Sequence, residues 1–342
     1  MSEWPMVGVA GARGVVGGVF LSILADAGLP PDRLRAYGTE PGKAAYGGGH
    51  LPITILDEGE AAELEVLFLA TDAAVSRQIV AGPGRNIPLI VDNSSAFRLD
   101  PAVPLVVPEA NAAALNEYRG NLVANPNCTT AAAAVVLAPI RDAAGLASVD
   151  LASYQAVSGA GRAGLDAFEE ERAADGLERA EGSPFHGRIA DSVVPQIDTL
   201  DETGWSGEER KIGAELRRIL GMPGLDLAAT TVRVPVRTGH SVAIHLRTER
   251  DATVAELEAA LRASPGLEYR PVDGSRRHPM PLDAAGRDPV LVGRLRGIPG
   301  RARGFALFLS SDNLRKGAAL NAIQVAAVAN PERFGRLVPN PR

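Results

Sequence analysis

The chain has 342 residues, which suggests about two domains, and its hydrophobic (46 %) and charged (22 %) contents are ordinary for a globular protein. These proportions exclude a disordered chain, a coiled coil and a collagen-like repeat. The formal charge of −6 gives no basis for binding nucleic acid, and no apolar run approaches the ~20 residues of a membrane span. With one cysteine and no signal-peptide pattern at its start, the chain is expected in the cytoplasm.

In the first part of the chain, short apolar runs alternate with helical patterns. Strands are expected at 6–10, 34–37, 64–70 and 88–91, and helices at 15–27 and 74–80. Buried strands that alternate with helices are typical of parallel βαβ units. The pattern predicts a doubly wound, Rossmann-like nucleotide-binding domain.

The pattern changes after residue 127. Helices are expected at 129–137, 208–220, 253–263 and 312–328, and strands at 151–157, 231–235, 242–247 and 305–309. The last two strands alternate in polarity, which predicts an antiparallel sheet with helices on one face. The segments 175–190 and 273–300 are rich in Gly, Pro and Arg, and we expect them to be exposed loops.

A glycine-rich segment joins the first strand to the first helix. It holds Gly8, Gly11, Gly14 and Gly17. Glycines in this position permit a tight turn and let a pyrophosphate approach the backbone at a helix N-terminus. The alternative is a plain glycine-rich turn, but the strand-to-helix context favours dinucleotide binding.

Cys128 stands in the segment NPNCTT, directly before an alanine-rich helix. At a helix N-terminus, the helix dipole and the free N–H groups stabilise a thiolate and lower the pKa of the thiol. A lone cysteine is otherwise most often a buried structural residue. The polar residues that flank Cys128 favour the other interpretation, a nucleophile.

A nucleophilic cysteine requires a base nearby in the fold, and His240 is the strongest candidate. It lies on a turn in the segment RVPVRTGH, after Pro235 and Gly239. His245 falls inside an alternating strand and is expected to be structural, whereas His50 and His186 read as surface residues.

Three further polar positions remain ambiguous from local sequence. Gln155 interrupts an apolar strand, so its amide must find a partner in the protein or in a ligand. Arg98 alone reads as a surface arginine, and the charged run 208–211 as a solvated helix face.

Together and in this order, these segments resemble the aspartate-semialdehyde dehydrogenase family. The matching segments are 11–17, 91–98, 125–130, 155–161, 208–211, 233–240, 288–294 and 311–321. The resemblance covers nearly the whole chain. The cysteine, arginine–histidine and C-terminal motifs are specific, and the opening loop is not.

The resemblance implies a fold and an activity. A Rossmann-like NADP-binding domain would comprise residues 1–127 with a C-terminal helix at about 313–342. Residues 128–312 would form an α+β catalytic and dimerisation domain of the glyceraldehyde-3-phosphate dehydrogenase type. The homodimer would reduce L-aspartyl-4-phosphate to L-aspartate 4-semialdehyde through a cysteine thioester, in the route to lysine, threonine, methionine and diaminopimelate.

The resemblance also implies roles for individual residues. Cys128 would be the nucleophile and His240 the acid/base, with Gln155 orienting the substrate and Asn127 positioning the reacting oxygen. The substrate and phosphate would be bound by Arg98 and Lys211 (phosphate), Arg233 (carboxylate) and Glu209 (ammonium). The cofactor would be bound by Gly8, Gly11, Arg13, Gly14, Val15, Val16, Thr39, Glu40, Ser158, Gly159 and Asn313. No metal is expected.

One departure from the family concerns the cofactor. Many members carry an Arg-Ser pair after the second strand, where the 2′-phosphate of NADP binds. Here the segment 38–43 reads GTEPGK, and an acid such as Glu40 suits the free ribose hydroxyls of NAD. Arg13 or Lys43 can supply the missing cation. The expectation is therefore NADP, with NAD left open.

Two alternatives come from different classes. An N-acetyl-glutamyl-phosphate reductase performs the same thioester chemistry, but its cysteine typically follows Pro-Gly and precedes Tyr. A non-catalytic nucleotide-binding relative should have lost the nucleophile, whereas the whole set of site residues is present here.

Overall fold

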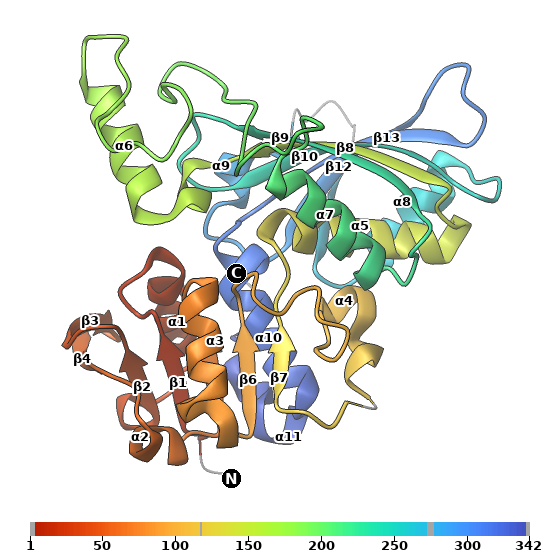
Figure 1. The fold of residues 1–342 in the computed structure, drawn as a ribbon. Helices are drawn as coiled ribbons and strands as arrows, with labels where there is room; N and C mark the ends of the chain where they lie inside the picture. The colour runs from red at the N-terminus through yellow and green to blue at the C-terminus, as the bar shows by residue number, and fades with distance from the viewer. Residues whose placement is uncertain (1–3, 117, 272–276, 340–342) are drawn as a thin grey trace. The chain divides into compact units, whose positions relative to one another are not determined.

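A computed structural model describes residues 4–116, 118–271 and 277–339. The chain divides into two units (Figure 1): the first holds the residues up to Asn127 and those from Ala318 onward, and the second is Cys128–Gly317. Residues 313–317 lie in the second unit, although the resemblance places them with the C-terminal helix of the nucleotide-binding domain. Each unit has its own sheet and its own helices.

The first unit is built on a seven-stranded sheet of order β3-β4-β2-β1-β5-β6-β7. Its strands are β1 (Val7–Ala10), β2 (Leu34–Tyr37), β3 (Gly42–Tyr46), β4 (Gly49–Thr54), β5 (Val66–Leu69), β6 (Leu89–Asp92) and β7 (Leu122–Ala124). All neighbours pair in parallel except β3, which runs antiparallel to β4. The sequence indicated the parallel strands of the doubly wound fold but not this hairpin, which turns on two glycines with positive φ, Gly47 and Gly48.

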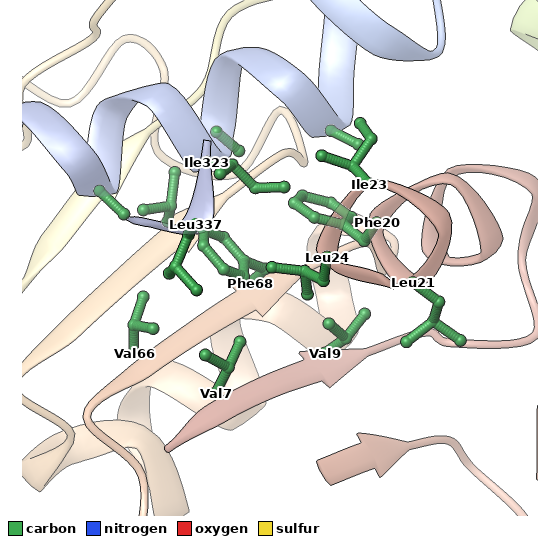
Figure 2. Packing of buried hydrophobic residues seen from close by; sticks show 14 of the residues in the cluster. Val7, Val9, Phe20, Leu21, Ile23, Leu24, Val66, Phe68, Ile323 and Leu337 are labelled. Atoms are coloured by element: carbon green, nitrogen blue, oxygen red, sulfur yellow. The ribbon is translucent and has the colours of Figure 1, made fainter. Parts of the chain in front are cut away.

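The core of the first unit brings together the two ends of the chain. Helix α1 (Val15–Asp26) and helix α10 (Leu320–Ala329) contribute to one apolar cluster with β1 and β5. Figure 2 shows Phe20 of α1 against Phe68 of β5, with ring centroids 5.0 Å apart, and Ile323 of α10 beside them. The remaining helices of this unit are α2 (Glu58–Ala62), α3 (Ala73–Ala81), α4 (Pro108–Asn111) and α11 (Pro331–Phe334).

The second unit contains a six-stranded sheet of order β11-β12-β13-β10-β8-β9. Its strands are β8 (Ser148–Gln155), β9 (Asp226–Arg233), β10 (His240–Arg247), β11 (Leu267–Arg270), β12 (Val290–Gly297) and β13 (Gly304–Ser311). As predicted, β10 and β13 are antiparallel. The sheet is nevertheless mixed, because β8 pairs with β9, and β11 with β12, in parallel.

Helices of the second unit pack on one face of this sheet. Helix α5 (Cys128–Ala144) lies against β10, β12 and β13, and it contacts both α7 (Gly207–Ile219) and α8 (Val254–Ala263). The other helices are α6 (Gly161–Ala173) and α9 (Pro281–Ala284). The helix expected at 312–328 starts later, because Arg315–Ala319 forms a π-helical turn before α10.

Two predicted exposed loops differ from the structure. Ala180, Phe185 and Ile189 are buried in the first of them, because a buried carboxylate on α6 binds its backbone. The second contains β12, whose side chains are largely buried, and its residues 273–276 lie outside the described residues. Among the helices that the structure describes, none has the length and hydropathy needed to cross a membrane.

Candidate active site

Three neighbouring strands of the second unit bring polar side chains to one edge of its sheet. Strands β8 and β9 run in parallel and end at Gln155 and Arg233, which are paired in register. Strand β10 runs antiparallel to β8 and begins at His240. Because two strands end where the third begins, these three side chains meet at the same edge. All three are at most 6 % exposed.

A single residue, Ala156, orients both the histidine and the arginine. Its N–H donates to Nδ1 of His240 at 3.0 Å. Its carbonyl oxygen accepts from Nη1 of Arg233, also at 3.0 Å. Ala156 follows β8 directly, so the backbone at the end of this strand orients both side chains.

The hydrogen bond from Ala156 determines the tautomer of His240. A neutral imidazole that accepts at Nδ1 carries its proton on Nε2. His240 is 1 % exposed, and its Nε2 has no hydrogen-bond partner within the part of the chain that is described. Burial, and then the charge of Arg233, lower the pKa of His240 well below its ordinary value of 6.5. The group is therefore a neutral donor at pH 7, available to a substrate atom.

Cys128 is the first residue of α5, which begins one residue before the helix that the sequence predicted directly after Cys128, and its side chain is partly accessible. The π-helical turn approaches it closely: a β-carbon on Gly317 would lie 2.7 Å from Cβ of Cys128. Burial lowers the pKa of Arg233, and the charges of Cys128 and Glu208 oppose that shift. The thiol thus has both a helix N-terminus and a buried guanidinium to stabilise its anion.

Helix α7 contributes two adjacent glutamates with different surroundings. Glu208 is 8 % exposed, and its Oε1 accepts from Nε2 of Gln155 at 3.2 Å. The carboxylate of Glu209 instead accepts from the backbone N–H groups of Ser206 at 2.8 Å and Thr231 at 3.0 Å. Glu209, which we expected at the substrate ammonium, completes the capping box that begins α7. Glu208 is the glutamate that lies beside the other site residues.

The glycine loop after β8 leaves space next to these groups. A β-carbon on Gly159 would lie 2.6 Å from Nη1 of Arg233 and 3.2 Å from Nε2 of His240. The neighbouring Ser158 accepts from Nδ2 of Asn313 at 3.0 Å. Oδ1 of Asn313 accepts from the N–H of Gly239 at 2.9 Å. Ser158 and Asn313, both predicted to line the cofactor, thus connect this loop to the turn before His240.

The two predicted phosphate ligands lie in different units. In the first unit, Arg98 donates from Nε to the carbonyl of Asn125 at 2.9 Å and from Nη2 to that of Asn93 at 2.6 Å. Both carbonyls follow the carboxyl ends of parallel strands, the usual ligand-binding edge of such a sheet. In the second unit, Nζ of Lys211 is 2.6 Å from Oδ2 of Asp198. Lys211 therefore already has a carboxylate partner. Asn127, the last residue of the first unit before Cys128, is buried.

The predicted nucleotide loop lines a cavity of about 390 Å³ in the first unit. Gly11, Gly14, Arg13 and Thr39 are among its lining residues. Gly11 has a φ of +80°, a conformation that favours glycine. No side chain caps the N-terminus of α1. The N–H groups of its first residues, Val15 and Val16, therefore have no capping side chain that competes with a ligand. Gly8 lies on β1, where it packs against Leu64, Leu67 and Tyr37.

Arg13 and Glu40 are neighbours at the end of β2. Nη1 of Arg13 is 3.9 Å from Oε2 of Glu40, and its Nη2 donates to the backbone carbonyls of Glu40 and Pro41. Both side chains are largely exposed. A cation thus stands beside the acid that replaces the usual Arg-Ser pair.

The remaining histidines lie on the surface. His50 and His186 are exposed as expected, but His245 is exposed too, because it points away from the helix-covered face of β10. In the described ranges, no group of three or more His, Cys, Asp and Glu is placed to hold a metal ion. Sequence reasoning did not single out Glu208, although the pattern Ser206-x-x-Glu209 marks a capping box and so assigns Glu209, not Glu208, to the start of the helix.

Comparison with known proteins agrees with this geometry. The model of the semialdehyde dehydrogenase NAD binding domain matches residues 6–118, and that of the semialdehyde dehydrogenase dimerisation domain matches residues 137–316. The chain is 37 % identical over 335 residues to the aspartate-semialdehyde dehydrogenase of Bacillus subtilis, covering 94 % of this chain and 96 % of that protein.

Solved structures give the same result. Aspartate semialdehyde dehydrogenase II of Vibrio cholerae, solved alone and complexed with ASA, has a TM-score of 0.91 and 33 % identity, covering 97 % of this chain and 100 % of that one. The enzyme of Candida albicans with NADP, at 21 % identity and a TM-score of 0.72, is similar in fold; 98 % of this chain and 100 % of that one are covered.

Proposed function

The chain belongs to the semialdehyde dehydrogenase family, and from that premise we propose that it is an enzyme that reduces L-aspartyl-4-phosphate to L-aspartate 4-semialdehyde and phosphate. The observation that carries the proposal is the Ala156 backbone, which holds a neutral histidine and a buried arginine at the same strand edge. The charge of Arg233 in turn interacts with that of Cys128.

The substrate's charged groups match this set of residues. Arg233 binds the α-carboxylate, because a guanidinium presents two parallel N–H donors to a carboxylate. Glu208, rather than Glu209, faces the ammonium, since the carboxylate of Glu209 is engaged by two backbone N–H groups. Gln155, which already binds Glu208, orients the substrate beside it. An N-acetylated substrate lacks the ammonium that Glu208 would bind, and this favours the aspartyl over the N-acetyl-glutamyl substrate.

The thiolate of Cys128 attacks the acyl carbon of aspartyl phosphate. The S–C bond forms, the C–O bond to the phosphoryl group breaks, and phosphate leaves. Arg98 and Lys211 are the proposed phosphate ligands, and Lys211 would exchange part of its contact with Asp198 for this role. Asn127 is proposed to position the reacting oxygen.

The chain takes a nicotinamide cofactor, which supplies the hydride that reduces the thioester. The resulting alkoxide re-forms the C=O bond as the C–S bond breaks, which releases the aldehyde and returns the thiolate. No proton has to reach the oxygen in this sequence. We therefore propose that Nε2–H of His240 stabilises the alkoxide as a hydrogen-bond donor, since protonating Nδ1 would oppose the N–H of Ala156. This replaces the full proton transfer expected from the resemblance.

The cofactor is proposed to be NADP. The cavity lined by Gly11, Gly14 and Thr39 would hold the adenosine ribose. Gly8, Val15 and Val16, on the strand and helix that flank the loop, would complete the cofactor site. Arg13 is placed by two carbonyls near Glu40, so it neutralises the acid and can contact a 2′-phosphate. Gly159, Ser158 and Asn313 would line the nicotinamide side.

A direct assay tests the function. Purified protein is given aspartate semialdehyde, phosphate and NADP, and reduced nicotinamide is followed by absorbance. We expect turnover that depends on phosphate and is lost in Cys128→Ser, because serine lacks thiolate character. The same assay with N-acetyl-glutamate semialdehyde is the matched control. Faster turnover of that substrate would reject the proposal, as would full activity of the serine variant.

The family match assigns the second unit to a dimerisation domain. We propose a homodimer formed through the face of its sheet opposite α5. The cytoplasmic location expected from the sequence stays a prediction.

A further inference from the structure

A buried carboxylate outside the catalytic set organises the segment that follows α6. Glu171 is 1 % exposed. Its Oε1 accepts from the N–H of Ala180 at 3.1 Å, and its Oε2 accepts from those of Ile189 at 2.6 Å and Ala190 at 3.0 Å. One carboxylate therefore ties two distant parts of the segment to the helix. Hydrogen bonds to an ionised acceptor are stronger than neutral ones.

Two arginines of the segment complete the anchorage. Nη1 of Arg179 donates to the carbonyls of Ser183 at 3.0 Å and Phe185 at 2.7 Å. Nη2 of Arg188 donates to the carbonyl of Glu171 at 2.7 Å. These bonds fix the backbone on both sides of Phe185, in a stretch whose composition predicts an exposed loop.

The anchored segment contacts Arg233 twice. Phe185 is 5 % exposed, and the guanidinium carbon of Arg233 lies over its ring, 5.8 Å from the centroid. The same ring is packed against α6, because a β-carbon on Gly164 would lie 3.1 Å from Cζ of Phe185. Further along, Val194 and Arg233 exchange two backbone hydrogen bonds of 2.9 and 2.8 Å.

We propose that residues 174–194, here called the arginine clamp, set the direction of the Arg233 guanidinium and so determine the affinity for an α-carboxylate on the substrate. The inference rests on the proposed function, in which Arg233 binds that carboxylate. With Nη1 on Ala156 and one face on an aromatic ring, the guanidinium has few directions left for its free N–H groups. Phe185 and Glu171 are positioning residues: they act through Arg233.

Phe185→Leu tests the clamp, because it removes the ring and keeps an apolar side chain. We expect the KM for aspartate semialdehyde to rise about 5- to 20-fold, the range of one cation–π contact at a partly desolvated site, with kcat within about twofold of wild type. The control is Phe168→Leu on α6. Phe168 is equally buried (4 %) and also lies beneath a guanidinium, that of Arg172, which has no part in the proposed site.

A second substrate separates positioning from general damage. 3-Aminopropanal is aspartate semialdehyde without the carboxylate, so it cannot use Arg233. Phe185→Leu should leave its KM unchanged. An equal rise for both aldehydes, or an equal rise in the Phe168→Leu control, would overturn the proposal.

Anchorage can be measured without activity. In Glu171→Gln the charge that holds the segment is lost, and we expect faster tryptic cleavage at Arg179 and Arg188 than in wild type. Wild-type protein that does not turn over aspartate semialdehyde would reject the proposed function, yet leave this cleavage result intact. A Phe185→Leu variant with wild-type KM values would reject the clamp even if the wild-type enzyme is active.

Discussion

The two nitrogens of His240 have different tasks in this site. Nδ1 is bound to the backbone of Ala156, and Nε2 is left for the substrate. The sequence predicted the residue from the motif RVPVRTGH, but it could not predict the tautomer. The tautomer depends on a backbone N–H from a strand that lies more than eighty positions earlier in the chain.

Variants of His240 distinguish a hydrogen-bond donor from a proton-transferring base. Glutamine keeps an N–H donor near the Nε2 position, whereas alanine keeps none. We expect His240→Ala to lower kcat about 10²- to 10³-fold, the usual effect of removing an oxyanion donor, and His240→Gln to retain a clear part of the rate. Equal losses in both variants would contradict the donor role.

The pH dependence of the same variants supplies a second check. Because burial lowers the pKa of His240 well below 6.5, the group stays neutral as pH falls to that value. The protonation of His240 should therefore cause no fall in kcat/KM near pH 6.5, and wild type and His240→Gln should have the same pH profile in that region. The lowered pKa of His240 also makes the folded state less stable in acid. Below pH 6.5 the unfolded chain binds a proton at this histidine and the folded chain does not. The free energy of unfolding therefore falls, by up to about 1.4 kcal/mol for each pH unit below 6.5.

Cofactor choice depends on Arg13 and Glu40. A 2′-phosphate brings about two negative charges near Glu40, and a cation between them removes that repulsion. Arg13→Ala should raise the KM for NADP and leave that for NAD unchanged, while Glu40→Ala should improve NADP selectively. A wild-type kcat/KM that favours NAD, together with no effect of Arg13→Ala on NADP, would make Glu40 the specificity residue and reject NADP.

At the scale of elements, the two adjacent glutamates at the start of α7 have different roles. Ser206 and Glu209 form a capping box, in which each side chain satisfies the other's backbone N–H. Glu208, one residue earlier, faces Gln155 instead. The motif at residues 208–211 contains both glutamates and does not show which of them binds the substrate. The three-residue spacing from Ser206 does, because it identifies Glu209 as the capping residue.

A matched pair of variants tests this assignment. Glu208→Gln keeps an acceptor for Gln155 and removes the charge, so we expect kcat/KM for aspartate semialdehyde to fall about ten- to a hundredfold. Glu209→Gln should leave kcat/KM within about twofold. Glu209→Ala, which removes the cap, should lower the free energy of unfolding by about 1 kcal/mol, measured by urea denaturation. A larger kinetic loss in Glu209→Gln than in Glu208→Gln would return the substrate role to Glu209.

Several elements were beyond sequence reasoning. The alternation of apolar runs predicted β1, β2, β5 and β6 within one or two residues of their limits. The β3–β4 hairpin was missed because its apolar residues are few and its turn is glycine-rich. The segment that becomes the arginine clamp was predicted to be an exposed loop, since its burial depends on one carboxylate of the preceding helix and leaves no periodic pattern.

At the scale of the whole molecule, helix α5 packs against β10, β12 and β13 on one face of the sheet of the second unit, and the opposite face presents aromatic side chains. Tyr154 on β8 and Phe308 on β13 lie on this face, with ring centroids 6.1 Å apart, and Ala243 of β10 pairs in register with Phe308. Tyr154 is 39 % exposed, although β8 has a paired strand on each side. Further along the same strands this face carries the exposed Asp150 and His245, so its apolar part is the end at Tyr154 and Phe308. An exposed aromatic cluster on a sheet is typical of a subunit interface.

A charge placed on this face should prevent the proposed dimer. We expect wild-type protein to elute as a dimer in size-exclusion chromatography with light scattering, and Phe308→Glu to shift it to the monomer, because a buried unpaired carboxylate is strongly destabilising at an interface. Val328→Glu is the control, since Val328 on α10 is an exposed apolar residue (38 %, similar to Tyr154) that belongs to the first unit. If Phe308→Glu remains dimeric while Val328→Glu dissociates, the interface is formed by the first unit and the dimerisation face assigned here is wrong. Dissociation with a retained circular dichroism spectrum would further separate loss of the interface from loss of the fold.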